Sequence, residues 1–422
     1  MKMRNTFTMY FMLIATGVFP VQKYIWLHGL EGQKGSNTWD IYKQHLTNEN
    51  GYIFEYESNK SIPAIAGDIY TNQISLVEGN DNLILIGHSM GGLVARSVQL
   101  LSPGVKGIIT VGAANSGSVL LANTLNGKTY DYFSKAVRMV NAAVDKSLLS
   151  GIFSGPPVTI IALPVIGPIN VFKDVVVNKT LDLMKLSYQI GIGIYALGHP
   201  CIRDMLPNST YLRTLNAASC NVPVLNIYGS EDYWQVVRAV GTLKNVAEVK
   251  NPLNMDKNFD MEFVSKMQSA LGIIYQIQRT HNLVYNALAV PAIFMPWIWL
   301  TRELVLDARF EWDAIYRYFE TGIHADFATN MGSVEYRLQN YCIPTGFDLN
   351  KISCTQKYLP YIIENDGILS RKDVISPLLT GINIHNIRVS GVNHQEMGNH
   401  IEMRKLLEGI INYKTYGETF SR

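Results

Sequence analysis

The sequence predicts an α/β fold: a mostly parallel sheet, helices on both faces, and a largely helical cap or lid insertion. Over the first 111 residues, short runs of β-branched and apolar residues alternate with segments of helical spacing. Strands that alternate with helices form parallel sheets whose crossover connections cover both faces. The alternation stops near residue 120, and 47% of the 422 residues are hydrophobic, enough for a large core.

Each predicted strand is a short apolar run next to turn residues. The clearest is Leu83–Ile86, which is purely apolar, and Val21–Leu27 ends at a His-Gly pair. The expected strands comprise residues 21–27, 51–56, 83–86, 105–111, 222–228, 361–363 and 384–390. Helices are expected from Asn37 or Thr38 toward Leu46, over residues 64–78 and 91–101, and near residues 260–280.

Two long insertions interrupt the sheet pattern, at about residues 120–220 and 235–355. The first contains an apolar stretch, residues 158–172, in which Pro164 and Pro168 argue against a membrane span. The second contains residues 287–300 (ALAVPAIFMPWIWL), which also hold two prolines. This stretch is shorter than the about 20 residues that a spanning helix needs, so it suits a buried or interfacial segment better.

The N-terminus resembles an export signal. Lys2 and Arg4 precede an apolar stretch from Phe7 to Val18, and Ala15-Thr16-Gly17 is the nearest cleavage candidate. We therefore expect residues 1–19 to be a signal peptide, residues 20–422 to form the α/β domain, and the protein to be secreted or periplasmic. The alternative is a buried first strand or helix.

The four cysteines and the charge balance bear on the remaining classes of site. The local spacings suit two disulfides, Cys201–Cys220 and Cys342–Cys354, as expected after export; four unrelated thiols are the alternative. None of the cysteines sits in a CxxC pair or beside a histidine cluster, so we expect no metal. The formal net charge of +2 gives no reason to expect a nucleic-acid partner.

Gly87-His88-Ser89-Met90-Gly91 is a G-x-S-x-G motif between a predicted strand and a predicted helix. This setting lifts a serine above the sheet edge on a tight, strained turn, where Gly87 and Gly91 avoid clashes with the backbone. The helix N-terminus beneath the serine favours the negative charge that develops during acyl transfer. Ser89 is therefore the predicted nucleophile.

A nucleophilic serine needs an oxyanion hole and a base. The Met90 N–H follows the serine directly, and the second donor is expected from His28-Gly29-Leu30-Glu31-Gly32, with the Leu30 N–H as candidate. We expect His28 to shape this loop rather than transfer protons. The base is predicted to be His394, which follows the run 387–392; His385 and His400 are its competitors.

Two aspartates compete for the third position of the triad. Asp366 follows the predicted strand 361–363 and precedes His394 by 28 residues, whereas Asp232 follows the predicted strand 222–228. In the order Ser, acid, His, the acid usually precedes the strand of the histidine directly. The sequence favours Asp366 and keeps Asp232 as the alternative acid.

Several segments resemble the lipase and esterase branch of the α/β-hydrolases, especially bacterial triacylglycerol lipases. The resemblance covers about half of the chain and leaves residues 235–355 unmatched. Residues 111–118 (VGAANSGS) depart from the usual TxGTPxxGS pattern, because they lack its Thr-Pro pair. The other matching segments are HGLEG at 28–32, GHSMGG at 87–92, DMLPNSTYLRTLN at 204–216, ENDGI at 364–368 and NHQE at 393–396.

The resemblance implies a serine carboxylester hydrolase that forms an acyl-enzyme on Ser89, with His394 as base and Asp366 as acid. It implies no cofactor, a small-molecule or lipid ester as substrate, and contact of the cap with a lipid surface. The same triad also serves an amidase, a thioesterase or a lipid deacylase resembling GPI-inositol deacylases. An α/β-hydrolase-like binding module without catalysis is a further alternative.

Overall fold

A computed structural model describes residues 21–30, 39, 42–129, most of 131–146, 199–218, 220–230, 257–318, 322–345, 348–377, 383–394, 396–398 and 400–421. The predicted signal peptide, the apolar stretch 158–172 and Asp232 lie outside the described residues.

The core of the molecule is a six-stranded sheet in which every neighbouring pair is parallel. The strands predicted within it are confirmed, apart from their ends. In spatial order they are β2 (Gly51–Phe54), β1 (Lys23–Leu27), β3 (Leu83–His88), β4 (Val105–Val111), β5 (Val224–Ser230) and β8 (Ile384–Ser390).

Helices cover both faces of this sheet, as predicted. Alternate side chains of β1 point to opposite faces: Ile25 and Leu27 join one buried cluster, and Tyr24 and Trp26 join the other. The first cluster includes α2 (Ile62–Asn72) and α3 (Met90–Leu101), and the second includes α16 (Ile401–Tyr413). The central strand β3 reads as a continuous apolar run because both of its faces are buried.

The strand order reverses between β1 and β3. The chain passes from β1 outward to β2, then returns across β1 to β3 and continues toward β8. In open α/β sheets, the carboxyl ends of the strands at such a reversal border the ligand-binding crevice. The loop 28–30 follows β1 and Ser89 follows β3, so both lie at this point.

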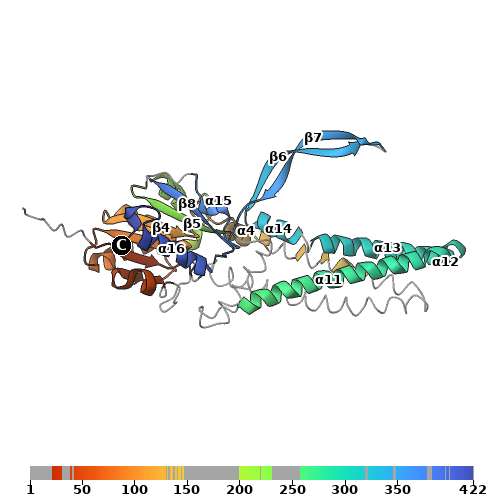
Figure 1. Cartoon of the computed structure of the whole chain (residues 1–422), viewed down its shortest axis with the longest axis horizontal. Helices are drawn as coiled ribbons and strands as arrows, with labels where there is room; N and C mark the ends of the chain where they lie inside the picture. The colour runs from red at the N-terminus through yellow and green to blue at the C-terminus, as the bar shows by residue number, and fades with distance from the viewer. Residues whose placement is uncertain are drawn as a thin grey trace, which may run out of the picture.

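One predicted strand is not part of the main sheet. Residues 361–363 were expected to return to it, but β7 (Asp348–Ile362) pairs only with β6 (Val334–Thr345), as an antiparallel hairpin. The hairpin, called the β-arm below, projects away from the sheet domain (Figure 1). A three-residue apolar run has no periodicity that distinguishes a buried strand from the base of such a hairpin.

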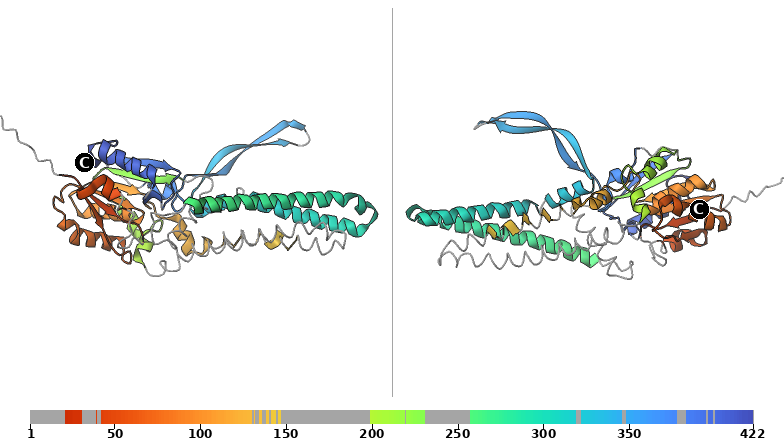
Figure 2. Two further views of the ribbon diagram at one scale, coloured as in Figure 1. Left: turned by 60° about the horizontal axis from the view of Figure 1, so that its bottom comes forward. Right: turned by 180° about the vertical axis from the view of Figure 1, so that it is seen from behind.

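A second projection consists of helices. The helix predicted near 260–280 is α11 (Lys257–Ala287), and the chain returns through α12 (Ala289–Phe294) and α13 (Pro296–Arg317). Together they form a long helical hairpin whose tip lies at the far end of the molecule from the sheet (Figures 1 and 2). In the part of the chain that the structure describes, no helix combines the length and apolar character needed to span a membrane.

The predicted Cys201–Cys220 disulfide is wrong, because both residues are buried free thiols. Cys201 lies on α8 (Pro200–Asp204), where its Sγ donates to Ser58 O at 2.8 Å. Cys220 directly precedes β5, and its Sγ contacts Val222 O at 3.5 Å. The helix α9 (Thr210–Ala217) lies between the two cysteines in the chain, so their short sequence spacing does not bring the sulfurs together.

Candidate active site

Ser89 occupies a strained turn between β3 and α3. Its φ is 53° and its ψ is −122°, a conformation that residues other than glycine rarely adopt. The glycines on either side have no room for a side chain: a Cβ on Gly87 would lie 2.2 Å from Gly91 O, and one on Gly91 would lie 2.4 Å from His28 O. The Ser89 N–H donates to Val111 O at 2.8 Å, which ties the turn to β4.

The loop after β1 lies directly beside this turn. A Cβ on Gly29 would lie 3.0 Å from Ser89 Cβ. Met90 is the first residue of α3, so its N–H has no acceptor within the helix. The candidate oxyanion donors, Leu30 N–H and Met90 N–H, therefore belong to two segments that meet at Ser89.

His28 supports the loop from within. Its ring stacks on Tyr56 with centroids 3.9 Å apart, and its Nδ1 donates to Gly29 O at 2.8 Å. The Nε2 accepts a hydrogen bond from the Tyr56 N–H at 3.4 Å, and the Tyr56 hydroxyl donates to His28 O. Burial lowers the pKa of His28, which keeps the ring neutral and suited to positioning the loop.

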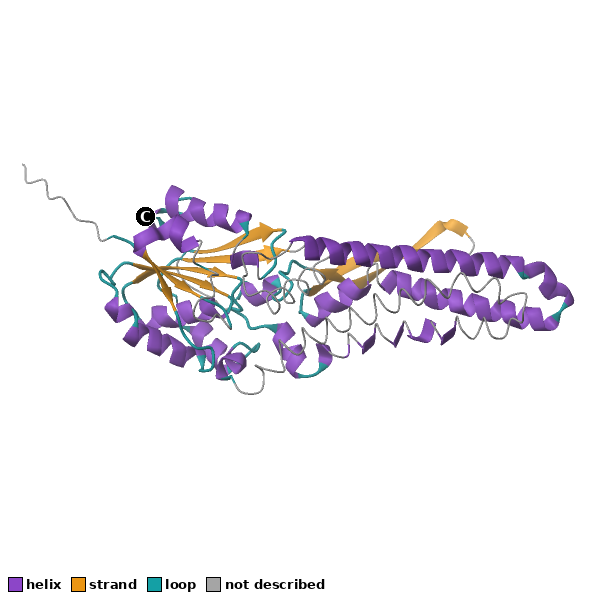
Figure 3. Cartoon of the chain, turned by 90° about the horizontal axis from the view of Figure 1, so that it is seen from below, coloured by secondary structure: helices purple, strands orange, loops and turns teal. Residues whose placement is uncertain are grey.

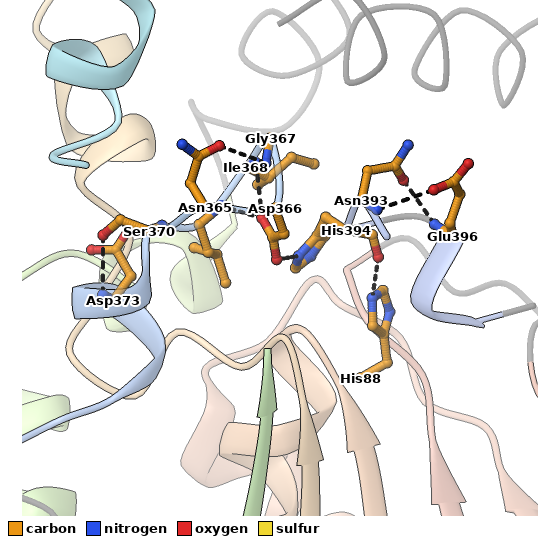
Figure 4. A network of polar contacts seen from close by, with 11 residues as sticks. His88, Asn365, Asp366, Gly367, Ile368, Ser370, Asp373, Asn393, His394 and Glu396 are labelled. Carbon is orange, nitrogen blue, oxygen red and sulfur yellow. Dashed lines mark hydrogen bonds and ion pairs between the residues drawn. The ribbon is translucent and has the colours of Figure 1, made fainter. Parts of the chain in front are cut away.

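His394 and Asp366 form a buried pair (Figure 4). His394 Nδ1 lies 2.8 Å from Asp366 Oδ2, and the His394 N–H donates to Asp366 O at 2.8 Å. The other carboxylate oxygen, Oδ1, accepts from the N–H groups of Ile368 at 2.9 Å and Leu369 at 2.6 Å. An ionised carboxylate only accepts hydrogen bonds, so Nδ1 carries the imidazole proton and Nε2 is left as the basic nitrogen.

Asp366 reaches the carboxyl end of the main sheet although it follows the β-arm. A Cβ on Gly229, near the end of β5, would lie 3.0 Å from Asp366 Cβ and 2.3 Å from Val392 O. The glycine makes room there for both the acid loop and the histidine loop. Asp232, the alternative acid, follows the same strand but lies outside the described residues.

His88 is a functional candidate that the sequence reasoning missed. Its Nε2 donates to the backbone O of His394 at 2.8 Å, and the two rings lie 4.8 Å apart (Figure 4). Burial, followed by the nearby His394, lowers the pKa of His88 to about 3, so the ring is a neutral donor. Its position beside the nucleophile in the motif was the available signal.

The candidate nucleophile and the candidate base both border the end of β4. The Ser89 N–H donates to Val111 O. A Cβ on Gly112, the residue after Val111, would lie 3.1 Å from Nδ1 and 3.2 Å from Cε1 of His394. No hydrogen bond joins the Ser89 hydroxyl to His394 within the described residues. Catalytic hydrogen bonds are often loose without substrate and tighten in the reacting complex.

The competing histidines lie elsewhere. His385 is near the amino-terminal end of β8, with its ring centroid 6.1 Å from that of Tyr416. The base must lie beyond the carboxyl end of the strand. His400 is the N-cap of α16, where its Nδ1 accepts the N–H of Glu402 at 3.2 Å. Among the described residues, no three His, Cys, Asp or Glu side chains are grouped to hold a metal ion.

The turn that carries His394 is closed by its two neighbours. The Asn393 N–H donates to Glu396 Oε2 at 3.1 Å, and the Glu396 N–H donates to Asn393 Oδ1 at 2.9 Å (Figure 4). These reciprocal bonds fix the backbone on both sides of the histidine. They account for the Asn and Glu of the NHQE segment without assigning either a chemical step.

A second buried carboxyl supports the acid loop. Asp373 closes the first turn of α15 (Arg371–Val374) by accepting the Ser370 N–H at 3.0 Å, while Ser370 Oγ accepts the Asp373 N–H at 3.2 Å. Burial raises the pKa of Asp373 to about 8, and the negative Asp366 contributes to the rise. Asp373 is therefore protonated over most of the acid and neutral range.

The loop after β4 is anchored by a buried arginine. Arg96 on α3 donates to Asn115 Oδ1 at 3.0 Å and to Asn216 Oδ1 at 2.8 Å. Asn115 Nδ2 donates in turn to Val374 O at 2.9 Å, and the Ser116 N–H donates to Asp373 O at 2.8 Å. Asn115 thus connects α3, which follows the candidate nucleophile, to α15 and the Asp366 loop.

Two comparisons with known proteins give matches to parts of the chain. A family model described as a PGAP1-like alpha/beta domain matches residues 41–162. Among solved structures, the chain is similar to the esterase RhEst1 from Rhodococcus sp. ECU1013, with 19% identity and a TM-score of 0.26 over 50% of this chain and 73% of that chain. No curated protein sequence matches it.

The matched segment contains β2 to β4, α2, α3 and the Ser89 turn. The remaining features are the parallel sheet with helices on both faces and the order Ser89, Asp366, His394 around its carboxyl edge. The chain therefore has an α/β fold with the layered sheet expected of an α/β-hydrolase, and residues 41–162 are similar to a PGAP1-like alpha/beta domain.

Proposed function

We propose that the protein is a serine carboxylester hydrolase with Ser89 as nucleophile, His394 as base and Asp366 as acid. The observation that carries the proposal is the buried 2.8 Å pair of His394 Nδ1 and Asp366 Oδ2 beside the strained Ser89 turn. The pair holds the tautomer in which Nε2 accepts the serine proton. The carboxylate also stabilises the imidazolium that forms.

The reaction runs in two halves. Ser89 Oγ attacks the ester carbonyl carbon while His394 Nε2 takes its proton, and the N–H groups of Leu30 and Met90 stabilise the oxyanion. The tetrahedral intermediate expels the alcohol, which receives the proton from His394. Water then attacks the acyl-enzyme with His394 as base. The carboxylic acid product leaves, and Ser89 is regenerated.

The nucleophile is tested by labelling the full-length protein with a fluorophosphonate probe. We expect the parent to be labelled and Ser89→Ala to remain unlabelled and to lose hydrolysis of nitrophenyl esters. Labelling that persists in Ser89→Ala would show that another residue is the nucleophile. An unlabelled parent that binds esters without turnover would identify a binding module.

The acid is tested by comparing Asp366→Asn with Asp232→Asn. We expect the first to lower kcat by about 10³–10⁴-fold, as loss of the triad carboxylate does in serine hydrolases, and the second to leave kcat within about threefold. The reverse result would assign the acid to Asp232.

The substrate class is tested with nitrophenyl esters of increasing acyl length, the matched amides and thioesters, and emulsified lipid. We expect turnover of the esters. Faster turnover of amides or thioesters would replace ester hydrolysis with one of those chemistries, and activity restricted to lipid would identify a lipid deacylase.

A further inference from the structure

The tip of the helical hairpin is covered with exposed apolar side chains. We define the hairpin tip as residues 289–300, which comprise α12 and the start of α13. Seven large apolar residues there are between 46% and 76% exposed. They are Val290, Ile293, Phe294, Met295, Trp297, Trp299 and Leu300.

These side chains point in several directions rather than along one stripe. Successive helical residues are rotated by about 100°, so Trp297 and Leu300 lie on one face of α13, whereas Trp299 points about 100° or more away from both. Ile298, in the same turn of α13, is buried in the small core between α11 and α13. A protein partner covers one stripe of a helix, whereas an apolar surface on several sides matches a medium that surrounds it.

The tip is also free of ionised side chains. Between Arg279 and Arg302 the sequence contains no Asp, Glu, Lys or Arg. The first charge after the tip, Arg302, places its guanidinium 3.9 Å from the centre of the Tyr285 ring and donates from Nε to Tyr285 O. An arginine and a tyrosine from the two helices thus mark one level of the hairpin, a combination typical of the edge of a lipid bilayer.

The dimensions of the tip suit shallow insertion. From Pro296, the first residue of α13, to Arg302 the helix rises by about 9 Å, at about 1.5 Å per residue. Interfacial segments bury their apolar face by about 5–10 Å. The α12 helix has six residues, so this part of the chain turns around within the interface.

We propose that the hairpin tip inserts into the headgroup and acyl boundary of a lipid bilayer, with Arg302 and Tyr285 at the surface. The flanking charges are mixed, with Glu303 and Asp307 following Arg302, so zwitterionic lipid is sufficient. The insertion holds the protein at a membrane through the end of the molecule opposite the sheet domain (Figure 3). This inference is independent of the proposed ester hydrolysis.

The test is flotation of the full-length Ser89→Ala chain with phosphatidylcholine vesicles, in which no lipid is consumed. A tip variant carries Phe294→Ser, Trp297→Ser and Trp299→Ser. The matched control carries Leu76→Ser, Tyr336→Ser and Tyr413→Ser, residues that are similarly exposed (81%, 67% and 72%) but distant in the chain. Circular dichroism checks the fold of each variant, and soluble-ester hydrolysis is compared in versions that keep Ser89.

We expect the Ser89→Ala chain and the control to float, and the tip variant to partition at least about tenfold less because three large apolar groups are lost. A Ser89→Ala chain that stays with the soluble fraction, or a tip variant that floats equally well, would overturn the proposal. The proposal would also be overturned if the parent formed a dimer without lipid and the tip mutations dissociated it, because a second copy would then cover the tip.

Tryptophan fluorescence gives a second readout. Trp26, Trp39 and Trp312 are fully buried, whereas Trp297 and Trp299 are 52% and 55% exposed. Phospholipids brominated near the headgroup should quench the tryptophan fluorescence of the parent. The double variant Trp297→Phe, Trp299→Phe should lose this quenching but still float with the vesicles. Quenching that persists in the double variant would place the lipid contact elsewhere.

Discussion

Three buried histidines near the site have their tautomers fixed by their hydrogen-bond partners. His28 donates from Nδ1 to Gly29 O, His88 donates from Nε2 to His394 O, and His394 directs Nδ1 at Asp366. A carbonyl or a carboxylate accepts in each case, which fixes the tautomer. Of the three, His394 alone is held by a carboxylate, so it alone is equipped to become an imidazolium during the reaction.

The hydrogen bond from His88 to the His394 carbonyl predicts a positioning effect. His88→Phe keeps an aromatic ring but removes the donor, which leaves a buried carbonyl unpaired at a cost of about 1–3 kcal/mol. We expect kcat to fall by about 10–100-fold with KM nearly unchanged, and fluorophosphonate labelling to slow in parallel.

The control is His385→Phe, an exposed histidine at the opposite end of β8. It should retain the parent's kcat. Equal kcat in His88→Phe and the parent would exclude the positioning role.

Asp373 predicts a pH dependence of stability. Its folded pKa of about 8 lies above its ordinary value of 3.8, so the folded state holds the proton more tightly than the unfolded state. The stabilisation is complete below about pH 4 and is lost as pH rises toward 8, by at most about 1.4 kcal/mol per pH unit.

Asp373→Asn removes this titration and keeps an acceptor for the Ser370 N–H. We expect its free energy of unfolding, measured in urea, to rise relative to the parent between pH 5 and pH 8. The exposed Asp307→Asn should show no such trend. A difference between Asp373→Asn and the parent that does not change with pH would contradict the prediction.

At the scale of elements, the central strands of the main sheet were predictable because both faces are buried and they read as nearly continuous apolar runs. The edge strand β8 is partly exposed, yet Val105–Val111 and Ile384–Ser390 both match their predicted bounds. The β-arm was not predicted, because residues 334–362 mix polar and apolar side chains without the signature of a buried face. Asp366 was nevertheless a candidate acid, since its loop carries a recognisable motif while the strand preceding it does not.

The helices beyond the main domain were predictable in part. The apolar spacing of 260–280 indicated α11, but the prolines of residues 287–300 obscured the return helix. In the structure Pro296 is the first residue of α13, a position where a missing N–H costs nothing. The sequence left open whether this stretch is buried or interfacial, and most of its large apolar residues are exposed, because the spacing of apolar residues does not reveal whether a partner element exists.

The register of the β-arm predicts a disulfide. Cys342 and Cys354 are directly opposite each other in the antiparallel pairing, a placement that keeps their α-carbons within the range that a disulfide spans. We expect an oxidised protein prepared by export to yield one linked peptide pair in non-reducing mass spectrometry, with Cys201 and Cys220 remaining free. Alkylation of all four cysteines without reduction would contradict this pairing.

On the scale of the whole molecule, the sheet domain and the helical hairpin have separate cores. Val284, Leu288, Ile298 and Val305 form a cluster of their own, distinct from the two clusters that flank the sheet. The two projections extend from the domain as distinct arms (Figures 1 and 2). The outer part of the hairpin therefore contributes little to the folding of the site.

This separation predicts the effect of shortening the hairpin. Replacing residues 280–301 by a short Gly-Ser loop should leave hydrolysis of a soluble nitrophenyl ester within about threefold of the parent, since longer or shorter surface connections change loop entropy only modestly. The measurement is kcat/KM on the purified variant. A loss above about 100-fold in a variant with unchanged circular dichroism would show that the hairpin tip takes part in the reaction.

The pairing of β5 with β8 has a consequence for how the chain can be divided. All arm residues lie between these strands in sequence, with the nucleophile on one side of them and both the acid and the base on the other. Seven register pairs, from Val224–Ile384 to Ser230–Ser390, hold the two sides together. A protease cut at either arm would therefore produce two polypeptides that each carry an incomplete set of reacting groups. Activity would then depend on whether this strand pairing and the packing of α16 against the sheet keep the two polypeptides together, which makes the protein a starting point for a split form of the proposed enzyme.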